Sequence, residues 1–166
     1  MAREFILHEE ILIRAPIARC FQLSTNIAIV QHELRMTPVR GHTKDLTTGC
    51  VSDGDTIRWE GWQLGLPQHH ESFIEAFTPP TFFRDRMIAG RFRTFEHDHA
   101  FEELDSNSVR LADELRFSMP FGLLGELIAT TLVIPHIRGL LHRRFQRLKR
   151  IAESEEWKQY LPNPDP

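Results

Sequence analysis

The sequence predicts an α+β chain in which a curved antiparallel sheet of about seven strands wraps around one long C-terminal helix. Three observations carry this prediction. Apolar residues recur with a period of two between residues 36 and 115, and short turn sequences interrupt them. After residue 120 the period becomes helical. The chain has 166 residues, of which 41% are hydrophobic, so it is long enough for one core. Residues 1–160 are therefore predicted to form a single domain, and residues 161–166 a disordered tail.

The first strand is expected at residues 5–14, where alternate residues are apolar, and it ends at Ala15-Pro16. Two short helices are expected next, at 17–26 and 27–34, because a proline is well tolerated at a helix start. The remaining strands are expected at about 37–47, 55–64, 68–78, 81–89, 92–104 and 108–118. Short strands joined by hairpin-length turns favour one antiparallel meander.

The C-terminal helix is the longest expected element, at roughly 30 residues. The apolar residues on or near one of its faces are Leu123, Leu124, Leu127, Ile128, Thr131, Leu132, Leu141, Phe145, Leu148 and Ile151. Pro135 removes one backbone hydrogen bond inside this helix, so a kink is expected there. Pro120, Glu126 and Pro135 interrupt the weakly charged stretch at 117–137. That stretch is therefore predicted to be a buried helix, and no integral membrane segment is expected.

Charge and cysteine usage narrow the class of partner. The 20 basic and 23 acidic residues leave a net charge of −3, which does not favour a polyanion. The basic run Arg138, Arg143, Arg144, Arg147, Lys149 and Arg150 is interpreted as a solvated helical face, and no nucleic-acid partner is predicted. Peripheral contact with anionic lipid stays open if the ligand is a lipid. The widely spaced Cys20 and Cys50 and the N-terminal sequence predict free thiols and a cytoplasmic location. The oligomeric state is not predicted.

A set of residues spread along the chain carries a family resemblance. These residues are Arg35-Met36-Thr37-Pro38, Pro79-Pro80, Phe83, Asp85, Gly90, Phe92, Phe95, His97, His99, Asp113, Pro120-Phe121-Gly122 and Gly125. The pattern, from about residue 5 to 152, resembles the START-like SRPBCC superfamily. This superfamily has the helix-grip fold of plant pollen allergens, lipid-transfer domains and polyketide cyclases. Within it, the chain is most similar to bacterial ligand-binding proteins of the cyclase/dehydrase-like or cell-division-inhibitor-like subgroup. The resemblance implies an internal cavity and supplies no metal or cofactor, and it does not specify a reaction.

Strand parity singles out one polar cluster. On strand 92–104, Phe95, His97, His99 and Phe101 share a face, and on strand 108–118 the odd positions do likewise. A hairpin centred on Ser106 would pair His99 with Asp113 and His97 with Leu115. Two imidazoles and a carboxylate would then lie on an apolar wall, where unpaired polar groups are costly.

Three interpretations of this cluster stay open. The first is a buried hydrogen bond that stabilises the sheet. The second is a set of polar anchors that orients an apolar ligand. The third is chemistry: either His99 acts as a general acid/base oriented by Asp113, or His97, His99 and Asp113 bind a metal. Because the resemblance supplies no metal, none is predicted.

Several other residues also allow more than one interpretation. Trp59 and Trp62 have opposite parity, so at most one faces the cavity. His69-His70-Glu71 is interpreted as a solvated strand start. Asp85 shares parity with Phe83 and Met87, and both an inward and a surface position stay open for it.

The predicted function is the binding of a hydrophobic or aromatic small molecule, lipid- or polyketide-like, in a cavity between sheet and helix. The predicted ligand-binding residues are Phe83, Asp85, Met87, Phe95, His97, His99, Phe101, Asp113, Leu115, Phe117, Leu127 and Thr131. One alternative is an enzyme of the polyketide cyclase/dehydratase type that uses His99 and Asp113 as acid and base. A second alternative is an interaction module whose cavity is filled by its own phenylalanines.

Overall fold

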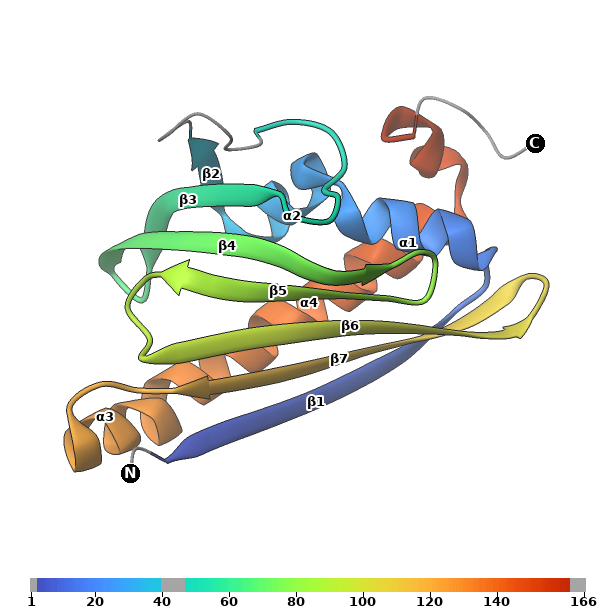
Figure 1. Ribbon diagram of the computed structural model, residues 1–166. Coiled ribbons are helices and arrows are strands. Elements are labelled where there is room, and N and C mark those ends of the chain that lie inside the picture. The colour runs from blue at the N-terminus through green and yellow to red at the C-terminus, as the bar shows by residue number, and fades with distance from the viewer. Residues whose placement is uncertain (1–2, 40–46, 162–166) are drawn as a thin grey trace.

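The structure is a computed structural model that describes residues 3–39 and 47–161. The strands are β1 (Glu4–Ile13), β2 (Met36–Val39), β3 (Thr56–Gln63), β4 (Leu66–Thr78), β5 (Phe82–Ala89), β6 (Thr94–Asp105) and β7 (Ser108–Ser118). They form one antiparallel sheet in the order β1-β7-β6-β5-β4-β3-β2. The sheet curves around the long C-terminal helix, which crosses behind it in Figure 1. The predicted fold class is confirmed.

Two short helices follow β1 as expected, α1 (Ile17–Thr25) and α2 (Ile27–Leu34). Asn26 separates them, because its side-chain oxygen accepts a hydrogen bond from the Ala28 backbone N–H at 3.0 Å and so caps α2. Of the strand predicted at 37–47, only β2 forms; residues 40–46 lie outside the described residues, and Thr47 is not in a strand.

The long helix runs without a break from Gly122 to Glu153. It consists of α3 (Gly122–Ile128), a π-helical turn at Ala129–Val133 and α4 (Ile134–Glu153). Pro135 lies in the first turn of α4, directly after the π-helical turn. A π-helical turn changes the hydrogen-bonding register, so the disruption expected at Pro135 coincides with a local change of helix type.

By length and composition alone, this helix is also apolar enough to cross a membrane. Its most apolar 18-residue window has a mean hydropathy of 1.3, and 22% of that window is buried. Farther along the same helix, Leu141, Phe145 and Leu148 are buried in the core against the sheet. A core helix passes the same composition test, so the absence of an integral membrane segment stays a prediction.

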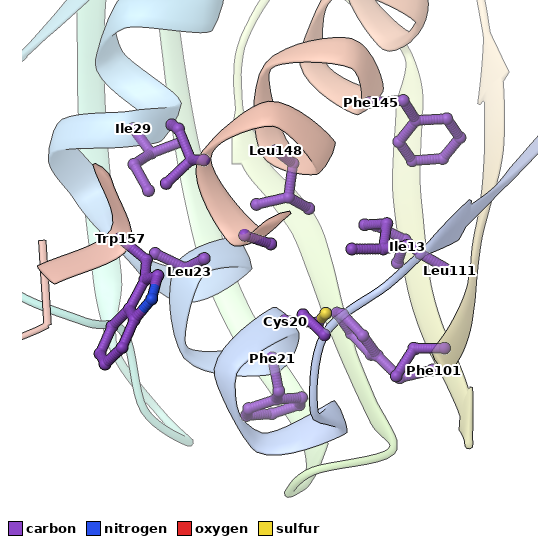
Figure 2. Packing of buried hydrophobic residues seen from close by; sticks show 14 of the residues in the cluster. Ile13, Cys20, Phe21, Leu23, Ile29, Phe101, Leu111, Phe145, Leu148 and Trp157 are labelled. Atoms are coloured by element: carbon purple, nitrogen blue, oxygen red, sulfur yellow. The ribbon is translucent and has the colours of Figure 1, made fainter. Parts of the chain in front are cut away.

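Within residues 3–39 and 47–161, the buried apolar side chains form three hydrophobic clusters. In the first, Phe21 of α1 packs against Phe101 of β6, and Leu148 of α4 is a further member (Figure 2). The second cluster joins Phe5, Leu7, Leu115 and Phe117 of the sheet to Val133, Ile137 and Leu141 of the helix. The third joins Ile57, Trp59 and Ile74 to Ile27 of α2. Leu161, expected to begin a disordered tail, is instead buried in the first cluster. Residues 162–166 lie outside the described residues.

Candidate functional site

The predicted register of the last hairpin is confirmed. His99 lies opposite Asp113, and His97 lies opposite Leu115. Along β6, Phe101 belongs to the first core cluster, whereas Phe95 packs against the second. The two histidines therefore lie at the boundary between two clusters, on the concave face of the sheet, which is the face toward α4.

His99 and Asp113 form a buried hydrogen-bonded pair. The His99 Nδ1 atom lies 2.7 Å from Asp113 Oδ1, and the two residues are only 4% and 0% exposed. Burial lowers the pKa of His99 to about 3, so the ring is neutral near pH 7. Because the ionised carboxylate of Asp113 can only accept, His99 Nδ1 carries the proton and donates it. The Phe83 ring stacks on the His99 ring, with the two ring centroids 4.3 Å apart, and this contact restricts the orientation of the imidazole.

Arg144 of α4 compensates the Asp113 charge. Its Nη1 atom lies 3.5 Å from Asp113 Oδ2, and its Nε atom lies 3.7 Å from Glu33 Oε2 of α2. Burial alone would raise the pKa of Asp113, but His99, Arg144 and His97 together hold it well below its usual value. Burial raises the pKa of Glu33 to about 7, although Arg144 and Arg147 act in the opposite direction. Through Arg144 of α4, this buried network connects Asp113 of β7 to Glu33 of α2.

The solvated-face interpretation of the basic run is wrong for Arg144, which is 9% exposed. Its side chain shares a helix face with Leu141 and Leu148, three residues before it and four after it. Both leucines are buried, and this spacing is the sequence signal that identifies Arg144 as an inward residue.

The polar cluster does not fit a metal ion. Potential ligand atoms of His97, His99 and Asp113 lie within 4.8 Å of one another. However, one oxygen of Asp113 accepts from His99, and the other lies 3.5 Å from the Arg144 guanidinium. A cation bound there would break the first contact and be repelled by the second. The arrangement is typical of a buried ion-pair network.

His97 and Asp85 lie farther along the concave face. His97 Nε2 is 3.2 Å from Asp113 Oδ2, but the angle does not make a hydrogen bond, and the atom has no such partner. Asp85 of β5 lies opposite His97 and faces inward, which settles the question that parity left open. Asp85, Met87, Phe95 and His97 are half-buried.

Two inward polar residues of β4 were not predicted as site residues. His70 contacts the Phe95 ring edge-on at 5.2 Å, and burial lowers its pKa. Ser72 is fully buried, and its hydroxyl has no hydrogen-bond partner. Interpreting His70 as part of a solvated strand start was wrong, because alternation backward from the buried Ile74 and Ser72 places it inward.

Of the two tryptophans on β3, Trp59 is buried and Trp62 is 68% exposed, as opposite parity requires.

Leu127 and Thr131 do not join the other predicted residues. Leu127 is 59% exposed, and Thr131 is also exposed. The helix face toward the core carries Gly125, Ala129 and Val133, all buried. A Cβ at Gly125 would lie 1.9 Å from the carbonyl oxygen of Pro120, in the turn that leads into the helix, so this position requires glycine. The larger leucines lie on the outer side, where apolar periodicity alone misplaces them.

A hydrogen bond connects the end of β3 to the long helix. Gln63 Oε1 lies 2.7 Å from His136 Nε2, and the Gln63 side-chain amide also donates to the Leu34 carbonyl at the end of α2. Gln63 thus joins the end of β3 to both α2 and α4. No periodicity or spacing in the sequence identifies this contact, because its three residues are far apart along the chain.

One end of the concave face is filled by the protein's own aromatic rings. Phe21, Phe77, Phe83 and Phe101 lie with ring centroids 5.2–6.2 Å apart. Two open hollows lie elsewhere, with volumes of about 620 and 420 Å³, and Thr37 lines both of them. Neither is lined by any of the twelve predicted ligand-binding residues.

Comparisons with known proteins point to one kind of architecture. No protein-family model and no curated protein matches the sequence. Among solved structures, a START superfamily protein from Mycobacterium smegmatis superposes with a TM-score of 0.62 at 12% identity, over 86% of this chain and 98% of that chain. A norcoclaurine synthase variant from Thalictrum flavum gives 0.66 at 9%, over 93% and 99%. Major latex-like protein 151 from Panax ginseng gives 0.62 at 8%, over 91% and 99%. At such identities these similarities show the fold alone.

Proposed function

Because the chain has the START-like helix-grip fold, we propose that it binds a hydrophobic or aromatic small molecule, lipid- or polyketide-like, between the concave face and the long helix. One observation carries the proposal. The inward residues Asp85, Met87, Phe95 and His97 are only half-buried, whereas Phe83, next to them on β5, is 3% exposed. The concave face is thus buried around Phe83, whereas it is partly exposed to solvent around Met87 and Phe95.

The half-buried end has the composition expected of a ligand site. Met87 and Phe95 supply an apolar surface, and His97 and Asp85 supply a few polar groups that fix orientation. A ligand that removes the remaining exposed apolar area from water gains about 25 cal/mol per Å². Membership of the cyclase/dehydrase-like subgroup and a cytoplasmic location stay predictions.

The protonation state of His99 favours binding over the cyclase/dehydratase alternative. A general base works best when its pKa lies near the operating pH. Burial lowers the pKa of His99 to about 3, which makes it a weak base near pH 7. The pair is better suited to holding the wall of a binding site than to moving protons.

The proposal is tested with N-phenyl-1-naphthylamine, a neutral aromatic probe whose fluorescence rises in an apolar site. Phe95→Ala is expected to weaken probe binding at least about tenfold, because losing an aromatic contact costs roughly 1.4 kcal/mol or more. Ile88→Ala is the matched control, since Ile88 lies on β5 beside Met87 but is 48% exposed. Equal affinities for the two variants, both confirmed as folded by circular dichroism, would contradict the proposal.

Peripheral contact with anionic lipid is a second prediction, and an exposed apolar surface at the start of the long helix supports it. Phe121, Leu123, Leu124 and Leu127 are between 59% and 84% exposed. The exposed residues Arg3 and Arg93 lie at the same end of the sheet, next to Ser118. Leu123→Ser is expected to lower co-sedimentation with phosphatidylglycerol vesicles severalfold. Unchanged co-sedimentation would count against this contact.

A further inference from the structure

The concave face carries two carboxylates in unequal environments. Asp113 lies beside His99 and Arg144, and both of its oxygens have partners. Asp85, two strands away on the same face, forms no ion pair among the described residues. Its Oδ1 atom is buried and has no hydrogen-bond partner. A buried carboxylate oxygen without a partner is costly, so this position needs a donor from elsewhere.

The residues around Asp85 do not supply a positive charge. The nearest arginines in sequence, Arg84 and Arg86, lie on the outer face, where they pair with Asp98 and Glu75. His70 is close enough to interact electrostatically with Asp85, but burial lowers the pKa of His70 and favours its neutral form. The half-buried end of the concave face therefore holds one uncompensated carboxylate, that of Asp85.

The hydroxyl of Ser72, on the neighbouring strand, also lacks a hydrogen-bond partner. A hydroxyl can accept a hydrogen bond. Nε2 of His97, directly across from Asp85, faces Asp113 Oδ2 at 3.2 Å instead. A donor that also carries a positive charge would satisfy both the unpartnered oxygen and the charge of Asp85, and an organic cation is such a donor.

We propose that the ligand carries a protonated amine, that Asp85 accepts its N–H groups, and that Met87 and Phe95 contact its apolar part. This inference rests on the proposed function and specifies its ligand class. The charge of the ammonium compensates the Asp85 carboxylate, and its several N–H donors suit the unpartnered acceptors of this region.

The test compares two ligands of nearly the same shape, 2-(2-naphthyl)ethylamine and 2-propylnaphthalene, in which a methyl group replaces the ammonium group. Each is titrated against N-phenyl-1-naphthylamine bound to the full chain at pH 7. The wild-type protein is expected to bind the amine at least tenfold more tightly than the hydrocarbon. Asp85→Asn is expected to reduce that preference to threefold or less and to leave hydrocarbon affinity within about threefold.

Glu96→Gln is the matched control, because it removes one carboxylate from the outer face of the neighbouring strand. It is expected to keep the preference for the amine. If the wild-type protein binds the hydrocarbon as tightly as the amine, or if Asp85→Asn keeps the preference, the amine inference is overturned and the proposed function stands. If neither ligand displaces the probe and the probe itself does not bind, the proposed function fails as well.

Discussion

Arg144→Met is expected to destabilise the fold by about 3–5 kcal/mol, because it leaves buried carboxylates without their positive partner. Arg144 is 9% exposed and lies between Asp113 of β7 and Glu33 of α2. A methionine fills much of the same volume, so the loss reports the charge rather than a cavity. The change in the free energy of unfolding is measured by urea unfolding monitored by tryptophan fluorescence, since Trp59 and Trp157 are buried.

The adjacent Arg143 provides the control. It is exposed, and Arg143→Met is expected to change the free energy of unfolding by no more than about 0.5 kcal/mol. The double variant Asp113→Leu/Arg144→Met should lose less stability than the sum of the two single variants, because each single change leaves one charge unpaired. A stability loss for Arg144→Met as small as that for Arg143→Met would show that no such buried network exists.

Acidification below pH 6.5 is expected to cost on the order of a few kcal/mol of stability through His99. In the unfolded chain His99 takes up a proton near its ordinary pKa of 6.5, whereas in the fold it stays neutral until about pH 3. A folded pKa below the unfolded value means that this stability is fully present above pH 6.5. It is lost progressively as the pH falls from 6.5 toward 3.

Glu33 acts with the opposite sign. Its folded pKa of about 7 lies above the ordinary 4.5, so its contribution is present below pH 4.5 and is lost as the pH rises to 7. The two effects partly cancel between pH 6.5 and 4.5. Below pH 4.5 the loss from His99 is no longer offset, and protonation of Asp113, whose folded pKa is also lowered, adds to it. The steepest loss of stability is therefore expected below pH 4.5.

Unfolding free energies of His99→Gln measured from pH 7 to 3.5 test this account. The variant is expected to be less stable at pH 7, because Asp113 loses a well-packed partner, but to lose less stability on acidification. His142→Gln, at an exposed helix position, should keep the wild-type slope. A His99→Gln slope identical to that of the wild-type protein would refute the assignment of the acid loss to His99.

The parts of the site that could be predicted from the sequence are those set by local geometry. One hairpin positions His97, His99 and Asp113: strand parity places them on one face, and a register shift between Glu103 and Asp105, next to the turn, gives the pairing centred on Ser106. The same logic applied to β4 identifies His70, provided that the alternation is followed backward from Ile74. Predictions within one hairpin depend on few contacts, and this is why they succeed.

The contacts that were missed involve elements far apart in the chain. Arg144 and Glu33 are separated by more than one hundred residues, and only the packing of α2 against α4 brings them together. The orientation of the start of the long helix was predicted wrongly for a different physical reason. Its large apolar residues and its buried face do not coincide, because Leu123, Leu124 and Leu127 are exposed whereas Gly125 and Ala129 are buried. Hydrophobic periodicity follows the large apolar residues and therefore selects the outer side of this helix.

Native mass spectrometry of the chain purified from its own cells tests the central claim most directly. If the half-buried end of the concave face is a ligand site, the wild-type protein is expected to retain a small molecule at one copy per chain. Phe95→Ala should lose that molecule while Ile88→Ala keeps it. A wild-type spectrum without any bound molecule, in preparations from several growth conditions, would contradict the claim that this face binds a ligand.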